Sequence, residues 1–372
     1  WSDGMTGEDS YHYYMTEGDY DNDEGFPIEG LEVPSEYMSY EMLEIEIDGV
    51  NHTYVLNDYG VPLKNYWYWD TDDQAHYFDE YGDMARYWNY IYDSYYWFGS
   101  DGVMKTYWQK VYGKYYWLGN DGAMRTGWQT VYGKKYYLGN ANDGAMKTGW
   151  QTVDGKKYYL GNASDGAMKT GWQTVDGKKY YLGNDGAMKT YWQQIDGKWY
   201  FFGNDGVMRT YWQKIWGKWY FLGNASDGAM KTGWQKIWGK WYYLDANGVM
   251  QYGWQKIKGV WYYLGGSSDG AMKTGWQKIN GKWYYLNSNG VMQTYWYLEN
   301  GKYYFLGANG SVRTGWQNIW GKYYHFDSDG VMQTGWKYIG KNWYYMDGNG
   351  VMQTGWKTIN GKRYYFGSNG YA

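Results

Sequence analysis

Pairs of tryptophan residues seven positions apart are the feature of this sequence whose residue types and spacing suggest chemistry. Six such pairs occur: Trp192 with Trp199, Trp212 with Trp219, Trp234 with Trp241, Trp254 with Trp261, Trp276 with Trp283, and Trp336 with Trp343. Two indoles on one face, closed by a third aromatic ring, can hold a quaternary ammonium group by cation–π attraction worth about 2 kcal/mol when desolvated. A flat aromatic pair can equally stack on a sugar ring. A purely structural alternative is that these tryptophans pack between repeats.

The pairs belong to a sequence repeat that begins at tryptophan. The repeating tryptophan stands at positions 88, 108, 128, 150, 172, 192, 212, 234, 254, 276, 296, 316, 336 and 356, which makes 14 units. Nine intervals are 20 residues long and four are 22. The longer intervals carry two extra residues at one place: Ala141-Asn142, Ala163-Ser164, Ala225-Ser226 and Ser267-Ser268. Insertions confined to one place predict a surface loop there.

Each unit has the pattern of a β-hairpin followed by a glycine-rich connector. In the unit at Trp172, two short runs of strand-forming residues flank Asp176-Gly177, a strong signal for a two-residue hairpin turn. Such a turn fixes the register, with Trp172 opposite Tyr181. Units that carry Trp-Gly or Tyr-Gly at the same place (Trp216, Trp238, Tyr112) suit this turn less well.

Alternation of side chains along the strands predicts which face is buried. Val175, Tyr180 and Leu182 share one face, which is the more uniform between units, and we expect it to be the core side. Trp172 and Lys179 share the other face. The sequence therefore predicts that the tryptophan pairs lie on the face away from the core.

An isolated hairpin is marginally stable in water, whereas successive hairpins can bury their faces against one another. The sequence thus predicts an all-β solenoid of stacked two-stranded β-hairpins, with about 14 repeats of 20–22 residues, over residues 66–372. Thr-Gly-Trp recurs because each hairpin starts there, and we expect its glycine to let the connector approach closely. Residues 1–65 form an acidic N-terminal segment with degenerate strands, interpreted as a cap, a linker or a head.

Charge separates these two parts of the chain. Residues 1–60 hold 16 acidic and no basic residues, whereas residues 61–372 hold 23 acidic and 35 basic residues. The basic residues are spread through the units, which is typical of a solvated face and not of a nucleic-acid site. An acidic head and a basic body would also complement each other in a self-assembling filament or stalk. Because the chain begins with Trp1 and no signal peptide follows, we expect a processed form or a fragment.

Other functional classes have little support in the sequence. There is no cysteine, no long apolar run that would span a membrane, and no metal spacing among His12, His52 and His76. His325 occupies a slot that other units fill with aromatic residues, so we interpret it as structural. The segment 19–25 resembles the start of a calcium loop, but Glu24 stands where that loop needs glycine, which favours a solvated acidic segment. We predict no cofactor, no metal, no nucleic-acid partner and no enzymatic activity. An alternative is the targeting part of an enzyme or toxin whose catalytic domain is absent from the sequence.

The repeat resembles a known family. Gly-Trp-Gln-Thr-Val-Asp-Gly-Lys-Lys-Tyr-Tyr-Leu (149–160), with Asp-Gly-Ala-Met-Lys-Thr-Gly-Trp, is similar to the cell-wall-binding or choline-binding repeats, and the similarity covers about residues 82–372. The same superfamily includes the glucan-binding repeats of glucansucrases and the repetitive oligopeptides of clostridial toxins. The resemblance implies an extracellular or surface protein of a Gram-positive bacterium. Its expected partner is choline or phosphocholine of teichoic acid, or a wall glycan.

The resemblance also implies the composition of each binding site. The walls would be the repeat tryptophan, the first aromatic of the Trp-Tyr-Tyr run, and an aromatic residue of the following hairpin, which we assign to Tyr220, Tyr242, Tyr262, Tyr284 or Tyr304. Three units place lysine at the second wall (Lys135, Lys157, Lys179), where it would repel a cation, so we expect those three sites to be empty. The Lys-Lys-Tyr-Tyr units look closer to the toxin repeats, which bind carbohydrate. Tyrosine replaces the glycine before tryptophan at Tyr107, Tyr191, Tyr211 and Tyr295, where we expect it to crowd a cage.

Overall fold

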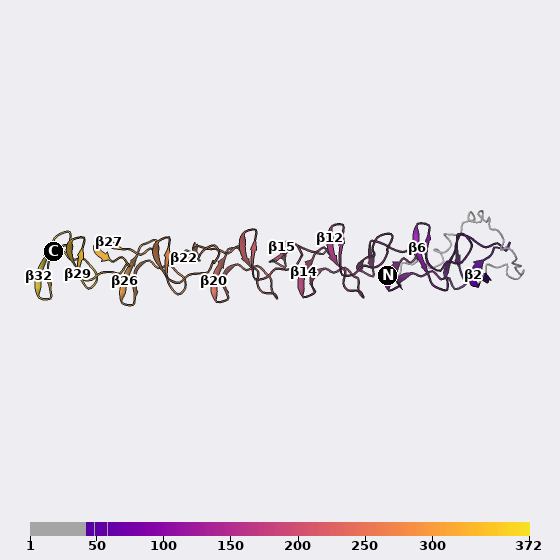
Figure 1. Cartoon of the computed structure of the whole chain (residues 1–372), viewed down its shortest axis with the longest axis horizontal. Helices are drawn as coiled ribbons and strands as arrows, with labels where there is room; N and C mark the ends of the chain where they lie inside the picture. The colour runs from indigo at the N-terminus through magenta and orange to yellow at the C-terminus, as the bar shows by residue number, and fades with distance from the viewer. Residues whose placement is uncertain (1–41, 48, 58) are drawn as a thin grey trace, which may run out of the picture. The chain divides into compact units, whose positions relative to one another are not determined.

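The computed structural model describes residues 42–47, 49–57 and 59–372, and every regular element in these residues is a β-strand. The strands form 16 two-stranded antiparallel sheets, each made of two strands adjacent in the sequence (Figure 1). The predicted all-β solenoid of stacked hairpins is therefore confirmed. The candidate calcium segment 19–25 lies outside the described residues.

The chain forms two compact units, one that ends at Lys189 and one that runs from Thr190 to Ala372. The strands of the first unit are β1 (Met42–Ile47), β2 (Val50–Val55), β3 (Tyr66–Trp69), β4 (Ala75–Phe78), β5 (Tyr87–Ile91), β6 (Ser94–Phe98), β7 (Tyr107–Val111), β8 (Lys114–Leu118), β9 (Trp128–Val131), β10 (Lys134–Tyr137), β11 (Trp150–Val153), β12 (Lys156–Tyr159), β13 (Gly171–Val175) and β14 (Lys178–Leu182). Its first hairpin, β1–β2, falls within the acidic segment. The predicted boundary at residue 65 stays a prediction.

The second unit consists of nine hairpins. Its strands are β15 (Tyr191–Ile195), β16 (Lys198–Phe202), β17 (Trp212–Ile215), β18 (Lys218–Phe221), β19 (Gly233–Ile237), β20 (Lys240–Leu244), β21 (Trp254–Ile257), β22 (Val260–Tyr263), β23 (Gly275–Ile279), β24 (Lys282–Leu286), β25 (Tyr295–Glu299), β26 (Lys302–Leu306), β27 (Gly315–Ile319), β28 (Lys322–Phe326), β29 (Gly335–Ile339), β30 (Asn342–Met346), β31 (Gly355–Ile359) and β32 (Lys362–Phe366).

The hairpin register agrees with the sequence. In β13–β14, Trp172 lies opposite Tyr181 and Val175 lies opposite Lys178, so Asp176-Gly177 is the two-residue turn. Both turn residues have positive φ, as a type I′ turn requires. The Trp-Gly tips, for which the sequence suggested a poorer fit, form the same turn, with φ of 47° at both Trp216 and Trp238.

The core lies on the face that the sequence predicted. Leu182 and its equivalents in neighbouring hairpins are fully buried, and Val175 and Tyr180 are nearly so. A typical core cluster joins Ile237, Tyr242 and Leu244 of one hairpin with Met250 of the next connector. Because each cluster draws on neighbouring repeats, a hairpin is stabilised mainly by the repeats beside it.

Backbone hydrogen bonds join the connectors to two successive hairpins. The amide of Met250 donates to the carbonyl of Trp219 at 2.8 Å, in the preceding hairpin, and the amide of Gln251 donates to the carbonyl of Tyr243 at 2.8 Å, in its own hairpin. The inserted pairs of residues are exposed, as predicted for a loop. The connectors therefore set how successive hairpins are placed.

The glycine of Thr-Gly-Trp has a different role from the one we expected. Gly233 has φ of +71°, and a Cβ added there would meet nothing within 4 Å, so close approach is not its function. It supplies a left-handed backbone conformation, which Tyr211 adopts at the equivalent place with φ of 59°. The close approach is made by the connector glycine Gly248, where a Cβ would lie 2.4 Å from the sulfur of Met230.

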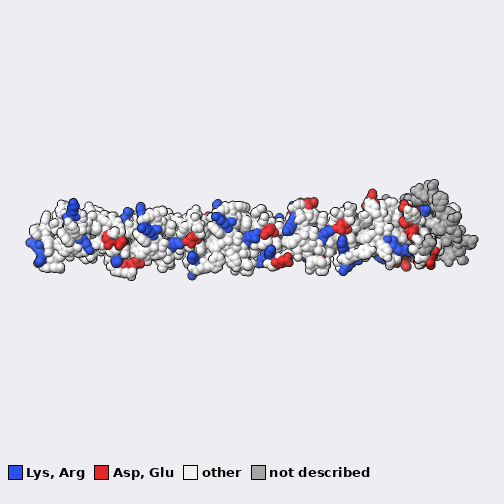
Figure 2. Space-filling model, in the orientation of Figure 1, with Lys and Arg blue, Asp and Glu red and all other residues white. Residues whose placement is uncertain are grey.

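Charged side chains are interspersed on the face shown in Figure 2, with lysine and arginine lying among acidic residues. Several connector lysines pair with the aspartate four residues earlier, as Lys273 does with Asp269 at 2.5 Å. Exposed pairs of this kind contribute little stability, up to about 1 kcal/mol each. The positive charge of these connector lysines is thus partly neutralised by aspartates in the same connectors.

Candidate functional site

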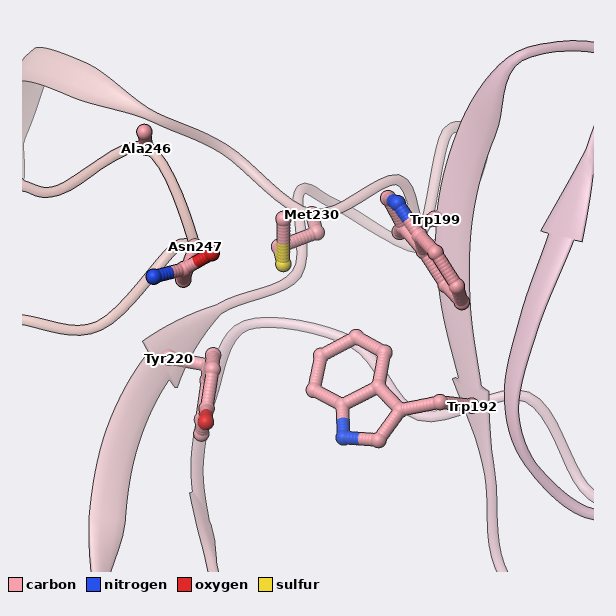
Figure 3. Close-up of a pocket in the computed structure, with 6 residues that line it drawn as sticks. All are labelled: Trp192, Trp199, Tyr220, Met230, Ala246 and Asn247. Carbon is pink, nitrogen blue, oxygen red and sulfur yellow. The ribbon is translucent and has the colours of Figure 1, made fainter.

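A hollow of about 310 Å³ lies between successive hairpins of the second unit. Trp192 and Trp199 of hairpin β15–β16 form one side, and Tyr220 of β18 lies opposite (Figure 3). Met230 from one connector, and Ala246 and Asn247 from the next, complete its lining. Trp192 is half-buried, whereas Trp199 is 42% exposed. The hollow is therefore aromatic on three sides and accessible from solvent.

The rings of the hollow stand at steep angles to one another. The ring centres of Trp192 and Trp199 are 6.5 Å apart at an interplanar angle of 82°, and those of Trp192 and Tyr220 are 5.0 Å apart at 61°. Such edge-to-face contacts are a favoured geometry for aromatic rings. Trp192 also contacts Phe201 with ring centres 5.2 Å apart, so its indole is held from several sides.

The same pair geometry recurs at three further tryptophan pairs. The pairs beginning at Trp212, Trp234 and Trp336 have ring centres 6.4 to 6.5 Å apart. Each repeat tryptophan also contacts a tyrosine of the following hairpin at 4.9 to 5.0 Å: Trp212 with Tyr242, Trp234 with Tyr262, Trp254 with Tyr284, Trp276 with Tyr304, and Trp336 with Tyr364. The structure thus brings every sequence-predicted third wall against a repeat tryptophan, and adds Tyr364.

The strand faces explain why a cage forms between hairpins. Trp192 and Trp199 lie on the face of β15–β16 opposite the buried residues of that hairpin, and Trp192 packs against the core cluster of the next hairpin, to which Tyr220 belongs. Burial raises the pKa of Tyr220, and the nearby Asp245 carboxylate raises it further, so the phenol stays neutral. A neutral aromatic wall near a carboxylate is an environment that favours a cation.

Comparison with known proteins places the repeats in a family. The model of the choline-binding repeat matches residues 147–191, 189–232, 231–274, 273–312 and 313–354, more than half of the chain. The chain belongs to the choline-binding repeat family. A cell wall binding repeat model also matches residues 106–124, 126–146 and 354–372. Membership of these families indicates a cell-surface or secreted protein.

Two solved structures of Streptococcus pneumoniae proteins share the architecture of these choline-binding repeats. CbpJ is 29% identical with a TM-score of 0.53, and the match covers 67% of this chain and 99% of that one. Choline binding protein F, crystallised in the presence of a peptidoglycan analogue, is 33% identical with a TM-score of 0.51, and the match covers 67% of this chain and 98% of that one. A search of curated proteins found no match.

Four further repeats have a tyrosine at the second-wall position, which sequence reasoning did not assign to a site: Tyr95, Tyr115, Tyr303 and Tyr323. In two of them this ring contacts the repeat tryptophan. Tyr95 lies 6.5 Å from Trp88 at 86°, and Tyr303 lies 6.5 Å from Trp296 at 83°. The tyrosines of the following hairpins, Tyr116 and Tyr324, lie 4.9 and 5.0 Å from the respective repeat tryptophans. An aromatic residue seven positions after the repeat tryptophan was the signal that could have identified these sites.

Lysine fills the second-wall position of other choline-binding repeats. The ammonium of Lys135 lies 4.9 Å from the ring centre of Trp128, and that of Lys157 lies 4.9 Å from the ring centre of Trp150. In the last repeat, the guanidinium of Arg363 lies 4.7 Å from the ring centre of Trp356. In these repeats the chain's own cation rests on the tryptophan.

The tyrosines that precede repeat tryptophans do not crowd the described hollow. Tyr191 is not among the residues that line the hollow at Trp192, and it contacts Phe201 at 6.3 Å instead. The expected crowding is therefore wrong at this site, because Tyr191 packs beside Phe201 and takes no part in the lining.

One repeat has an acidic group beside its tryptophan. Glu299 stands at a core position where most repeats carry valine or isoleucine, and its carboxylate accepts a 2.6 Å hydrogen bond from the indole N–H of Trp276. Tyr297 stacks on Tyr285 with ring centres 4.0 Å apart, and burial raises the pKa of Tyr297. This half-buried carboxylate distinguishes the Trp276 site from the others.

The described residues contain no cluster of metal-binding side chains and no membrane-spanning helix. No group of three or more histidine, aspartate or glutamate side chains in that part of the chain lies together as a metal site requires. The same residues include no helix of the length and apolarity needed to cross a membrane. His325 packs edge-on against Trp316 at 5.0 Å, and burial lowers its pKa, which agrees with its interpretation as a structural residue.

Proposed function

We propose that the chain is a non-catalytic wall-binding module that holds the trimethylammonium group of choline in aromatic cages between hairpins. The observation that carries this proposal is the hollow between Trp192, Trp199 and Tyr220, which combines three aromatic walls with access from solvent. The ligand in the cell would be phosphocholine on teichoic acid or on a wall glycan. The crystallisation of choline binding protein F with a peptidoglycan analogue supports a wall polymer as the partner.

Cation–π attraction accounts for selectivity in such a cage. A trimethylammonium group is a weakly hydrated cation that contacts ring faces through its methyl groups, gaining about 2 kcal/mol where water is excluded. Met230 adds a polarizable apolar contact to the lining. The Asp245 carboxylate, near enough to raise the pKa of Tyr220, adds a favourable negative potential.

We assign a cage to each repeat with an aromatic second wall and a tyrosine from the next hairpin. These are the repeats at Trp88, Trp108, Trp192, Trp212, Trp234, Trp254, Trp276, Trp296, Trp316 and Trp336. The repeats at Trp128 and Trp150 are excluded because a lysine ammonium occupies the tryptophan face. Several weak sites along one chain would bind a choline-bearing polymer much more tightly than any single choline.

A choline titration followed by tryptophan fluorescence and thermal melting tests this function. We expect a saturable response in the millimolar range and a higher melting temperature, since choline binds only the folded chain. Trp241→Ala removes one wall of a cage and should weaken the response. Trp238→Ala is the matched control, because Trp238 lies at the tip of the same hairpin and is 73% exposed.

We expect weaker choline binding in Trp241→Ala and unchanged choline binding in Trp238→Ala. If the wild-type chain shows no response, or if Trp238→Ala weakens binding as much as Trp241→Ala does, aromatic cages for choline are excluded. The tryptophan pairs would then serve as sugar platforms or as packing between hairpins.

A further inference from the structure

A second set of aromatic residues varies together across the repeats. Five of the 14 repeats carry tyrosine immediately before the repeat tryptophan: Tyr87, Tyr107, Tyr191, Tyr211 and Tyr295. In those five repeats the residue nine positions after the tryptophan is tryptophan or phenylalanine: Trp97, Trp117, Phe201, Phe221 and Phe305. The first turn residue of the following hairpin is then aromatic as well: Tyr112, Tyr132, Trp216, Trp238 and Trp320.

The other repeats show the opposite combination. Eight further repeats are followed by a hairpin. All eight have glycine immediately before the repeat tryptophan, and tyrosine or histidine nine positions after it. The first turn residue of the hairpin that follows is aspartate, lysine, asparagine or glycine. Three positions from two hairpins therefore change as a group, and we name each such group a tip triad.

The structure places the members of each tip triad in contact. Phe221 lies 6.5 Å from Tyr211 and 6.5 Å from Trp238, and Tyr211 lies 6.3 Å from Trp238. In the other triads the residue nine positions after the tryptophan lies 5.7 to 6.3 Å from the tyrosine and 5.8 to 6.3 Å from the tip ring. The concerted change in sequence thus corresponds to one physical cluster that joins adjacent hairpins.

The tip ring of a triad is held at its edge and stays open at its face. Trp216, Trp238 and Trp320 meet their phenylalanine at 89° and remain 73 to 75% exposed. Their φ values of 47° to 50° are a conformation that suits asparagine and disfavours bulky residues. An edge-to-face contact between aromatic rings contributes only about 0.5–1.5 kcal/mol of stability. A strained tip with a large exposed ring therefore indicates use of the ring face.

A tip triad differs in shape from a cage. All three rings touch one another in the triads of Tyr211 and Tyr295, so no hollow separates them. In the cage, the hollow separates Trp199 from Tyr220 (Figure 3). A trimethylammonium group has no enclosed place within a triad. The available surface is the outer face of the tip ring.

We infer that the tip triads are stacking sites for the sugar rings of a polysaccharide, with one pyranose ring on each exposed tip face. A pyranose presents an apolar C–H face that matches a flat indole or phenol ring. In every triad an exposed lysine follows the tip by two residues, as Lys240 follows Trp238, and it can donate to sugar hydroxyl groups. A single ring is far smaller than the roughly 800 Å² per partner of a stable protein interface.

The test uses the full chain with saturating choline chloride, which occupies the cages, and titrates chitohexaose and isomaltohexaose by calorimetry. The variant combines Trp216→Asn, Trp238→Asn and Trp320→Asn. Asparagine is the natural tip residue at Asn280, Asn300 and Asn360, so the hairpin turns are retained. We expect one of the two sugars to bind the wild-type chain and to lose at least fivefold in affinity in the variant.

Choline binding and the melting temperature of the same variant provide the controls. Both should match the wild-type values, and Trp241→Ala should keep its sugar affinity, which separates this inference from the proposed function. The inference is overturned if neither sugar binds the wild-type chain, or if the triple variant binds sugar as tightly as the wild type.

Discussion

At the scale of single residues, the position seven after the repeat tryptophan decides whether a cation of the chain itself lies on the tryptophan ring, and we propose that it thereby decides which cages take choline. An aromatic residue there brings no charge to the tryptophan, whereas Lys135 and Lys157 place their ammonium groups 4.9 Å from the ring centres of Trp128 and Trp150. The surrounding backbone is equivalent in both kinds of repeat. The amide of Met188 donates to the carbonyl of Lys157 at 2.8 Å, just as that of Met230 donates to Trp199 at 2.8 Å. One side chain therefore separates a filled cage from an open one.

Lys157→Trp should create a new choline site. Trp150 and Tyr180, 4.8 Å apart, already supply the first and third walls, so only the second wall and the removal of the ammonium are needed. We expect equilibrium dialysis to find one additional choline bound per chain. Lys157→Met, which removes the charge without adding a ring, is the control and should add none. An unchanged number of bound cholines in Lys157→Trp would show that the backbone, and not this side chain, prevents the repeat at Trp150 from binding choline.

His325 should make folding stability depend on pH. Burial holds its pKa below the ordinary value, so below about pH 6.5 the unfolded chain binds a proton that the folded chain resists. Stability is therefore complete above about pH 6.5 and falls as the pH drops toward the folded pKa. We expect His325→Tyr, which restores the residue most common at this place, to reduce the loss of melting temperature between pH 7.5 and pH 5. Equal losses in both proteins would contradict this.

At the scale of the hairpin, local sequence was sufficient for the fold. Asp176-Gly177 predicted the turn, the turn predicted the register, and alternation then placed Leu182 in the core. The tryptophan pairs followed from the same reasoning. Met230 and Asn247, which come from connectors beyond the cage hairpin, did not. Their place depends on how successive hairpins are set relative to one another, and no turn or alternation pattern encodes that.

The connector glycines also required the structure for their interpretation. We predict that Gly248→Ala destabilises the chain by about 2–5 kcal/mol, because strain at positive φ adds to a clash with Met230. Gly233→Ala should cost only about 1–2 kcal/mol, since φ is its sole restriction. Denaturant unfolding of the two variants measures the difference, and equal losses would show that Met230 moves away at little cost.

At the scale of the whole molecule, the proposed function combines many weak sites on one chain. Each cage depends on its own hairpin, the next hairpin and their connectors, so local damage to one repeat need not abolish the others. The acidic and basic residues shown in Figure 2 lie among one another on the repeats, so the charge contrast of the sequence is chiefly between residues 1–60 and the rest. Wall binding and charge-driven self-association would therefore respond to different conditions.

Salt and choline distinguish these two modes of association. Cation–π contacts in the cages act at short range and are screened little, so we expect the chain to stay on a choline-bearing resin when sodium chloride rises from about 0.1 to 1 M. Free choline in excess should release it, because it competes for every cage at once and removes the avidity of multiple attachment. Self-association of the acidic segment with the basic body should instead weaken over the same salt range, as measured by sedimentation. Release from the resin by salt alone would show that attachment is electrostatic and that the aromatic cages are not its basis.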